Sequence, residues 1–339
     1  MEIIIPSLKE KNTLSFIKNL SDIETSNENE IVFCFDAEWV KPLGMALCCS
    51  AVKQFSFKNE EIPMRMELHN CNASGYASHM GFFRTISESI AIGNSPGEAS
   101  GSPTYVPLTI IDLKDLQRRA FREGIVGEMN DIINIKSNQL ASILCRSNNN
   151  MQQLFSYIIR EILRNIPEHA ETQEAIICAQ YWPKNGKAEI AILDEGIGIK
   201  RSLRKNKMHR EYINTDTDAL ISAVKPGISQ AFSPDKKNMS RDVWANSGFG
   251  LFMASEICKR LCGEFWMVSG EKAIQINTSG ITEHNTFFEG TAIGIEFDIS
   301  KLENTKEMIE EIVEEGEEMA RSIRNAFVHA SEPSRSLLE

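Results

Sequence analysis

The chain has 339 residues, of which 42% are hydrophobic and 24% charged, with a net charge of −11 and a pI near 5.2. This length predicts roughly two or three domains, and the acidic balance argues against nucleic acid or an anionic membrane as the main partner. We find no signal peptide and no apolar run of about twenty residues. Eight cysteines, several within apolar runs, are typical of reduced thiols, so we expect a cytoplasmic protein.

Residues 1–91 predict a small α/β domain. Apolar patterns indicate strands at 31–35 and 64–68 and helices at 13–20, 45–55 and 76–83. This order resembles the STAS domain of anti-sigma-factor antagonists, which implies a phosphorylated serine in the turn ahead of a helix. The corresponding turn, Val40–Gly44, contains no Ser or Thr, so we expect a docking or dimerisation domain that contacts a protein partner.

Residues 92–112 begin with a cluster of turn-forming residues, Gly93–Pro103, and predict a flexible Gly/Ser/Pro loop. The following stretch, 113–150, is predicted to be a helical connector, because Leu113–Phe121 and Gly127–Leu144 have helical patterns. The connector leads into the helix that carries the first motif.

That helix contains Glu161 and Asn165, four residues apart. The spacing places the carboxylate and the carboxamide on one side, at the border of the inward face, and leaves Arg160 and Arg164 on the wetter side. A carboxylate can take a proton from water, and an amide oxygen can ligate Mg²⁺.

Three further motifs follow in order. An apolar strand ends in Asp194-Glu195-Gly196-Ile197-Gly198, then Ser247-Gly248-Phe249-Gly250-Leu251 opens a helix, and Gly290-Thr291 enters a strand. Together with Glu161 and Asn165 they resemble the GHKL ATPases, the superfamily of gyrase, the ninety-kilodalton heat-shock chaperones, histidine kinases and MutL. The resemblance covers residues 151–300 and implies a Bergerat-fold α/β sandwich, with the nucleotide between helices and a lid.

The resemblance also implies roles for individual residues. Glu161 would activate the attacking water as the catalytic residue, Asn165 would bind Mg²⁺, and Asp194 would accept a hydrogen bond from adenine. The implied nucleotide-binding residues are Asn165, Asp194, Gly196, Ile197, Gly198, Ser247, Gly248, Phe249, Gly250, Leu251, Phe252 and Thr291. Family members often carry a third glycine where this chain has Phe252, so the loop here is either less mobile or holds the phosphates differently. His169 is either a packing residue or catalytic.

The lid is expected at residues 199–247, and its basic run, 200–210, is either solvated surface or a phosphate or partner contact. Residues 264–268 and 273–277 predict a strand pair across a turn at Ser269–Lys272. An acidic helix is predicted at 301–330, either as a coiled-coil seam or packed on its own domain, and a disordered tail at 331–339. The predicted fold is thus a small α/β domain, an α/β sandwich and a C-terminal helix.

Two function classes remain open. The first is an ATPase in which ATP drives lid closure or homodimerisation and so controls a protein partner, through the N-terminal domain or the last helix. The second is a protein serine kinase or anti-sigma-like partner-switching regulator, and a nucleotide sensor without turnover also stays open. No histidine lies between Leu113 and Gln153, where a histidine kinase carries its phosphoacceptor, so a sensor histidine kinase is disfavoured. We expect no membrane partner.

Overall fold

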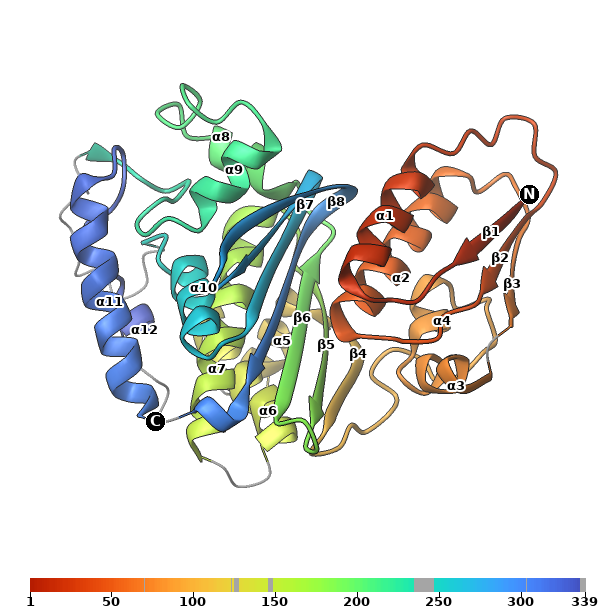
Figure 1. Ribbon diagram of the computed structural model, residues 1–339, viewed down its shortest axis with the longest axis horizontal. Helices are drawn as coiled ribbons and strands as arrows, with labels where there is room; N and C mark the ends of the chain where they lie inside the picture. Colours follow the sequence, from red (N-terminus) through yellow and green to blue (C-terminus); the bar gives the residue numbers. More distant parts are fainter. Residues whose placement is uncertain are drawn as a thin grey trace.

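The computed structural model describes residues 1–69, 71–122, 124, 128–145, 149–234, 247–302 and 304–335 (Figure 1). It contains a three-stranded parallel sheet and a five-stranded antiparallel sheet. Helices cover both faces of the larger sheet (Figure 1). The predicted mixed α/β fold is therefore confirmed.

The smaller sheet has the strand order β1-β2-β3. Its elements are β1 (Glu2–Ile5), α1 (Glu10–Ser21), β2 (Ile31–Phe35), α2 (Pro42–Lys58), β3 (Met64–Leu68), α3 (Cys71–His79) and α4 (Phe82–Ile86). All of β2 is buried, as expected for a central parallel strand with both faces covered. The predicted strands and first two helices are confirmed, but the single helix predicted at 76–83 is wrong. Gly81 has a φ of 87° and separates α3 from α4, because glycine adopts this left-handed conformation without steric cost.

The larger sheet has the strand order β4-β5-β6-β8-β7. Its strands are β4 (Tyr105–Asp112), β5 (Glu174–Trp182), β6 (Lys187–Asp194), β7 (Glu264–Asn277) and β8 (Gly280–Asp298). One face packs against α1 and α2 of the N-terminal unit (Figure 1). The other packs against α6 (Met129–Cys145), α7 (Asn149–Asn165) and α10 (Gly250–Arg260), with α5 (Leu113–Arg122) beside α6.

The N-terminal unit shares a core with the larger sheet. Phe33, Leu43 and Val52 belong to the same buried cluster as Ile176 and Leu193. The Leu43 side chain lies so close to β8 that a Cβ built on Gly294 would stand 2.5 Å from it. Protein interiors are close-packed, so the two sheets form one packed body.

Two predictions within the larger sheet are wrong. The last residues of the predicted loop 92–112 form β4, which pairs with β5 from Tyr105 to Asp112. The turn predicted at Ser269–Lys272 is absent, since β7 runs from Glu264 to Asn277 and pairs with β8 throughout. The register shifts on either side of Gly270, whose φ is 65°. The extra residues of this irregularity belong to β8, because the one residue of β7 between Val268 and Gly270 lies opposite three residues of β8 between Phe288 and Ala292.

The region between the first and second glycine motifs forms α8 (Gly198–Arg204) and α9 (Asp216–Ala223). These helices lie above the end of the larger sheet (Figure 1). Of the predicted lid, residues 235–246 lie outside the described residues. The short helix η1 (Ile166–Ala170) follows α7, and η3 (Ile299–Lys301) follows β8.

The C-terminal part differs from the prediction. The acidic helix α11 (Thr305–Ser322) ends eight residues before the expected 330 and packs on α10, where Arg260 pairs with Glu311 and Glu315. The predicted tail contains a short helix, α12 (Glu332–Arg335), and residues 336–339 lie outside the described part. Ser331 and Ser334 are buried. Ser334 is hydrogen-bonded to Glu161 and Tyr157 of α7, and Ser331 is hydrogen-bonded to Ser247.

Candidate functional site

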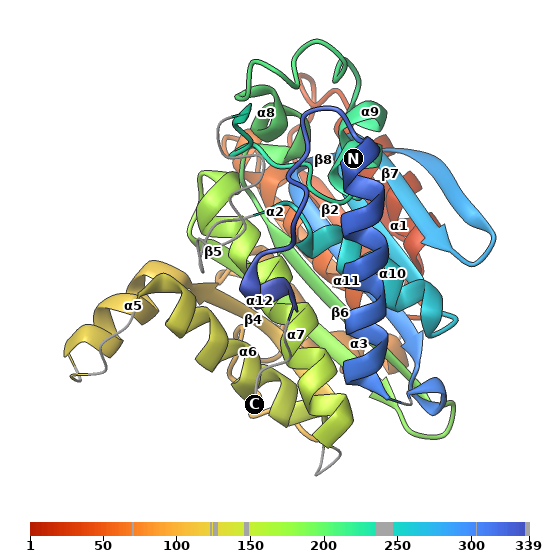
Figure 2. The same cartoon turned by 90° about the vertical axis from the view of Figure 1, so that its left-hand side faces the viewer.

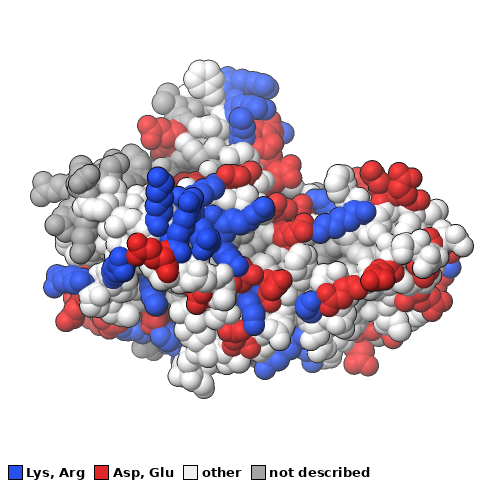
Figure 3. Space-filling model, turned by 90° about the horizontal axis from the view of Figure 1, so that it is seen from above, with Lys and Arg blue, Asp and Glu red and all other residues white. Residues whose placement is uncertain are grey.

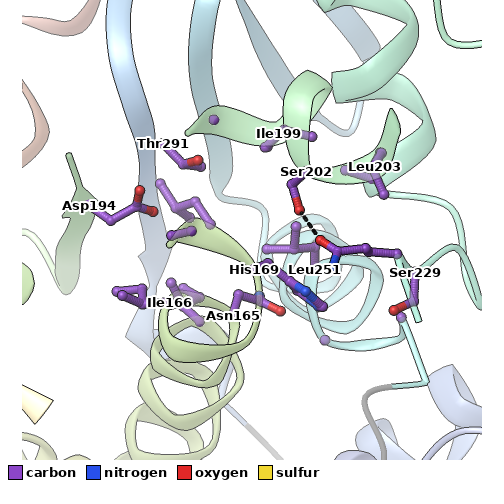
Figure 4. A pocket seen from close by; sticks show the side chains of 18 of the residues that line it. Asn165, Ile166, His169, Asp194, Ile199, Ser202, Leu203, Ser229, Leu251 and Thr291 are labelled. Atoms are coloured by element: carbon purple, nitrogen blue, oxygen red, sulfur yellow. Dashed lines mark hydrogen bonds between the residues drawn. The ribbon is translucent and has the colours of Figure 1, made fainter. Parts of the chain in front are cut away.

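A cavity of about 80 Å³ lies between the sheet, η1, α8 and the start of α10. Seven of the residues predicted to bind nucleotide line it: Asn165, Asp194, Gly198, Gly248, Gly250, Leu251 and Thr291. Figure 4 shows Asp194 and Thr291 on one side and Asn165, His169 and Leu251 below. Motifs that are far apart in the chain therefore converge on one cavity.

Asn165 is the last residue of α7. Its side-chain nitrogen donates a hydrogen bond to the backbone carbonyl of Glu161, at 3.1 Å. The side chain reaches the cavity from below (Figure 4), so its carboxamide group suits a hard cation held mainly by phosphate and water oxygens.

Asp194 ends β6 and pairs in register with Thr291 of β8. Its carboxylate is buried and accepts a hydrogen bond from the backbone N–H of Gly196 at 2.9 Å. Burial raises the pKa of Asp194 to about 6, because the charged form is poorly solvated there. A buried acceptor at the end of a strand can select a ligand that offers a donor.

The glycines of the first two glycine motifs are required by close backbone contacts. A Cβ on Gly196 would stand 2.1 Å from the carbonyl oxygen of Ala170, where the N–H of Ile197 also donates at 2.9 Å. Gly248 has a φ of 72°, and its Cβ would stand 2.2 Å from the carbonyl oxygen of Ile228. These contacts hold both loops against the cavity wall.

Gly250 and Leu251 begin α10, so the first N–H groups of that helix lie at the cavity. The N-terminal N–H groups of a helix have no partner within the helix, and the helix dipole favours an anion there. This end of the cavity is therefore suited to phosphate.

The other predicted nucleotide-binding residues do not line the cavity. These are Gly196, Ile197, Ser247, Phe249 and Phe252. Phe249 and Phe252 belong to the core, and a Cβ on Gly316 of α11 would stand 3.1 Å and 2.5 Å from their rings. Phe252 therefore packs against α11, which accounts for a large residue at this position.

Glu161 also lies outside the cavity lining and is 3% exposed. One carboxylate oxygen, Oε1, lies 3.2 Å from Nε of Arg160 and 3.6 Å from Nη1 of Arg164. The other, Oε2, accepts a hydrogen bond from the Ser334 hydroxyl at 2.8 Å. The prediction that Arg160 and Arg164 face the wetter side is wrong, because both are buried in the part of α7 to which the C-terminal segment is bonded.

Sequence reasoning missed three polar residues of the cavity, Ser202, Ser229 and Gln230. The Ser202 hydroxyl donates to Oε1 of Gln230 at 2.9 Å, the dashed line that begins at Ser202 in Figure 4. All three residues come from the predicted lid and carry no motif, so no signal in the sequence pointed to them. His169 also lines the cavity, and burial lowers the pKa of its imidazole to about 4, which keeps it neutral near pH 7.

A second, wider cleft of about 1040 Å³ lies on the other side of the Gly196–Gly198 loop. Seven cationic side chains line it, with three carboxylates: Lys53, Lys58, Lys200, Arg201, Arg204, Lys205 and Arg210, and Glu195, Asp216 and Glu289. Figure 3 shows basic side chains gathered on this face. Lys53 and Ser50 of α2 both bond to Glu195, at 2.8 and 2.6 Å, so the N-terminal unit contacts the first glycine motif directly.

No family model, curated protein or solved structure matches the chain. Within the described ranges, none of the helices combines the length and the apolar character that crossing a membrane requires.

Proposed function

We propose that this chain is a GHKL-type ATP-binding protein that hydrolyses ATP with Mg²⁺. The observation that carries the proposal is the convergence of Asn165, Asp194, Gly198, Gly248 and Thr291 on one cavity. Separate sequence motifs with separate expected roles meet at one place, and a chance set of glycines and polar residues has no reason to do so.

The chemistry of the cavity fits the parts of the nucleotide. Asp194 would accept a hydrogen bond from the adenine amino group, and the start of α10 would face the phosphates. Asn165 would provide the protein oxygen for Mg²⁺, which would balance phosphate charge. Glu161, one helical turn before Asn165, is the proposed general base for the attacking water.

Nucleotide entry requires the cavity to widen. Ligand pockets usually measure a few hundred Å³ or more, whereas this cavity measures about 80 Å³. Ser202 and Gln230 both line it and are hydrogen-bonded to each other. We therefore propose that α8 and the stretch around Gln230 form a lid that moves outward to admit ATP.

Six cysteines are free thiols, of which Cys262 is exposed and five are buried: Cys34, Cys48, Cys49, Cys178 and Cys258. Burial raises the pKa of the Cys48 and Cys178 thiols, which makes them poorly reactive. These properties support a cytoplasmic location for the proposed ATPase.

Calorimetric titration with Mg-ATP tests the binding site. We expect Asp194→Asn to weaken ATP binding roughly 10- to 100-fold, since a hydrogen bond to a charged acceptor contributes about 1.5–3 kcal/mol. Glu195→Gln is the matched control, because Glu195 is the next residue but faces the other cleft and bonds to Ser50 and Lys53. Absence of ATP binding by the wild type, or equal binding by Asp194→Asn, would contradict the proposal.

The affinity for ATP should also depend on pH. The pKa of Asp194 is raised to about 6, so the carboxylate that accepts the adenine hydrogen bond becomes protonated as the pH falls through that value. We expect about tenfold weaker binding at pH 5 than at pH 7.5. ATP itself also titrates in this range, so the measured quantity is the difference between the wild type and Asp194→Asn, which lacks the titrating group. If the affinity for ATP changes with pH in the same way in the wild type and in Asp194→Asn, Asp194 does not contact the ligand.

A further inference from the structure

The C-terminal segment, Ser331–Arg335, is bonded to the motif helix α7 and to the second glycine motif. The Ser334 hydroxyl donates to Oε2 of Glu161 at 2.8 Å, and the Tyr157 hydroxyl donates to the carbonyl of Ser334 at 2.9 Å. The N–H of Ser331 donates to the hydroxyl of Ser247 at 2.8 Å. Figure 2 shows α12 in front of α7, and Figure 1 shows it between α7 and α11. The segment is thus fixed at several points.

The hydrogen bond between Ser334 and Glu161 joins a hydroxyl to the proposed general base. Oxygen nucleophiles in group-transfer enzymes are recognised by such contact with a base at about 2.6–3.2 Å. In protein kinases a carboxylate accepts the proton of the substrate hydroxyl in this way. Ser334 is 1% exposed, so its hydroxyl takes the place that a water molecule would need for hydrolysis.

The hydroxyl also lies close to the expected position of the phosphates. A Cβ on Gly250 would stand 3.0 Å from Oε2 of Glu161, and Gly250 is the first residue of α10 and lines the cavity. The same carboxylate oxygen is the one that Ser334 contacts. The acceptor hydroxyl, the base and the helix N-terminus proposed to hold phosphate are therefore neighbours.

We propose that Ser334 is a phosphoacceptor, to which the terminal phosphoryl group of ATP is transferred within the same chain. This inference rests on the proposed function. Ser334 Oγ forms a bond to the γ-phosphorus while the bond from that phosphorus to the bridging oxygen of the β-phosphate breaks. ADP leaves, and the Ser334 proton moves to the carboxylate of Glu161. Hydrolysis then occurs only after the C-terminal segment has left α7 and a water molecule has replaced the Ser334 hydroxyl beside Glu161.

The test uses the full chain with Mg-ATP, followed by intact mass and peptide mass spectrometry. We expect a gain of one phosphoryl group at Ser334, at a first-order rate that is independent of protein concentration because acceptor and base belong to one chain. Ser334→Ala should gain no phosphoryl group, and Glu161→Gln should be phosphorylated about 10²–10⁴-fold more slowly than the wild type. Ser322→Ala is the matched control, because Ser322 ends α11 on the surface with its hydroxyl bonded to Met319, and it should be phosphorylated like the wild type.

The phosphorylated residue is identified by mass spectrometry in the wild-type protein, so the test remains valid even when a variant folds poorly. Turnover of ATP without phosphoserine at Ser334 would overturn the inference and leave the proposed ATPase function intact. Faster phosphate release by Ser334→Ala, again without phosphoserine in the wild type, would show that the segment only blocks Glu161. Failure to bind ATP, measured by calorimetry on the same samples, would overturn both proposals.

Discussion

Glu161→Gln is expected to slow phosphate release from ATP by about 10²–10⁴-fold, while the affinity for ATP changes by less than about threefold. Glutamine has nearly the same shape as glutamate, but its amide cannot take a proton from water at neutral pH. Glu161 lies outside the cavity lining, so its replacement should leave the nucleotide contacts in place. The effect should therefore appear in kcat and not in binding.

The measurement is steady-state phosphate release beside calorimetric binding on the same preparations. Glu171→Gln provides the matched control, since Glu171 lies at the exposed end of η1 and pairs with Lys205 on the surface. Equal turnover by wild type and Glu161→Gln would exclude Glu161 as the base. Parallel loss of binding and turnover would instead indicate that the variant disturbs α7, where Arg160 and Arg164 both lie near the same carboxylate.

Local patterns predicted the elements whose structure depends on neighbouring residues. The apolar run of β2 and the helical spacing in α7 both specify burial directly. β4 was missed because it is stabilised by pairing with β5, more than sixty residues later, and by no pattern of its own. Ser269–Lys272 was taken for a turn because its glycine favours one, whereas β7 continues through Gly270 opposite an irregular stretch of β8. That irregularity depends on the partner strand and has no local pattern.

The candidate site was predicted to the extent that its residues carry motifs. Asn165, Asp194 and Gly248 carry motifs, and all three line one cavity. Ser202, Gln230 and Ser334 were not predicted, because the role of a serine or glutamine in a polar stretch depends on the tertiary contact that it makes. The environment of Glu161 was likewise unpredictable, since it depends on a segment over 170 residues later in the chain.

Lys41 joins the N-terminal unit to the larger sheet through three carboxylates. Its ammonium group contacts Glu10, lies 3.1 Å from Glu189 Oε2, and lies 2.8 Å from Glu296 Oε2. Glu189 is 2% exposed, and its other oxygen accepts the N–H of Leu43 at 2.9 Å. Burial raises the pKa of Glu189 to about 7 even though Lys41 opposes this. The three carboxylates are close enough to suggest a cation site, and Lys41 supplies the cation.

Lys41→Met is expected to lower the free energy of unfolding by about 3 kcal/mol at pH 8, because it leaves Glu189 buried beside two other carboxylates without a counter-charge. Lys187→Met is the matched control. It also removes a partner of Glu296, at 2.6 Å, but the Lys187 side chain is 51% exposed, so we expect a loss of at most about 1 kcal/mol. Urea unfolding at equilibrium measures both values.

The sign of the pH dependence gives a sharper test of Lys41. Glu189 keeps its proton in the folded protein up to a pKa of about 7, above its ordinary value, so stability falls as the pH rises between the unfolded and folded pKa values. Without Lys41 the folded pKa moves higher, and the fall continues to higher pH. The deficit of Lys41→Met should therefore be larger at pH 8 than at pH 5, where Glu189 can be protonated. A deficit independent of pH would mean that Lys41 acts through packing of its aliphatic chain against the sheet, and that the charges of Glu10, Glu189 and Glu296 contribute little to the contact between the two units.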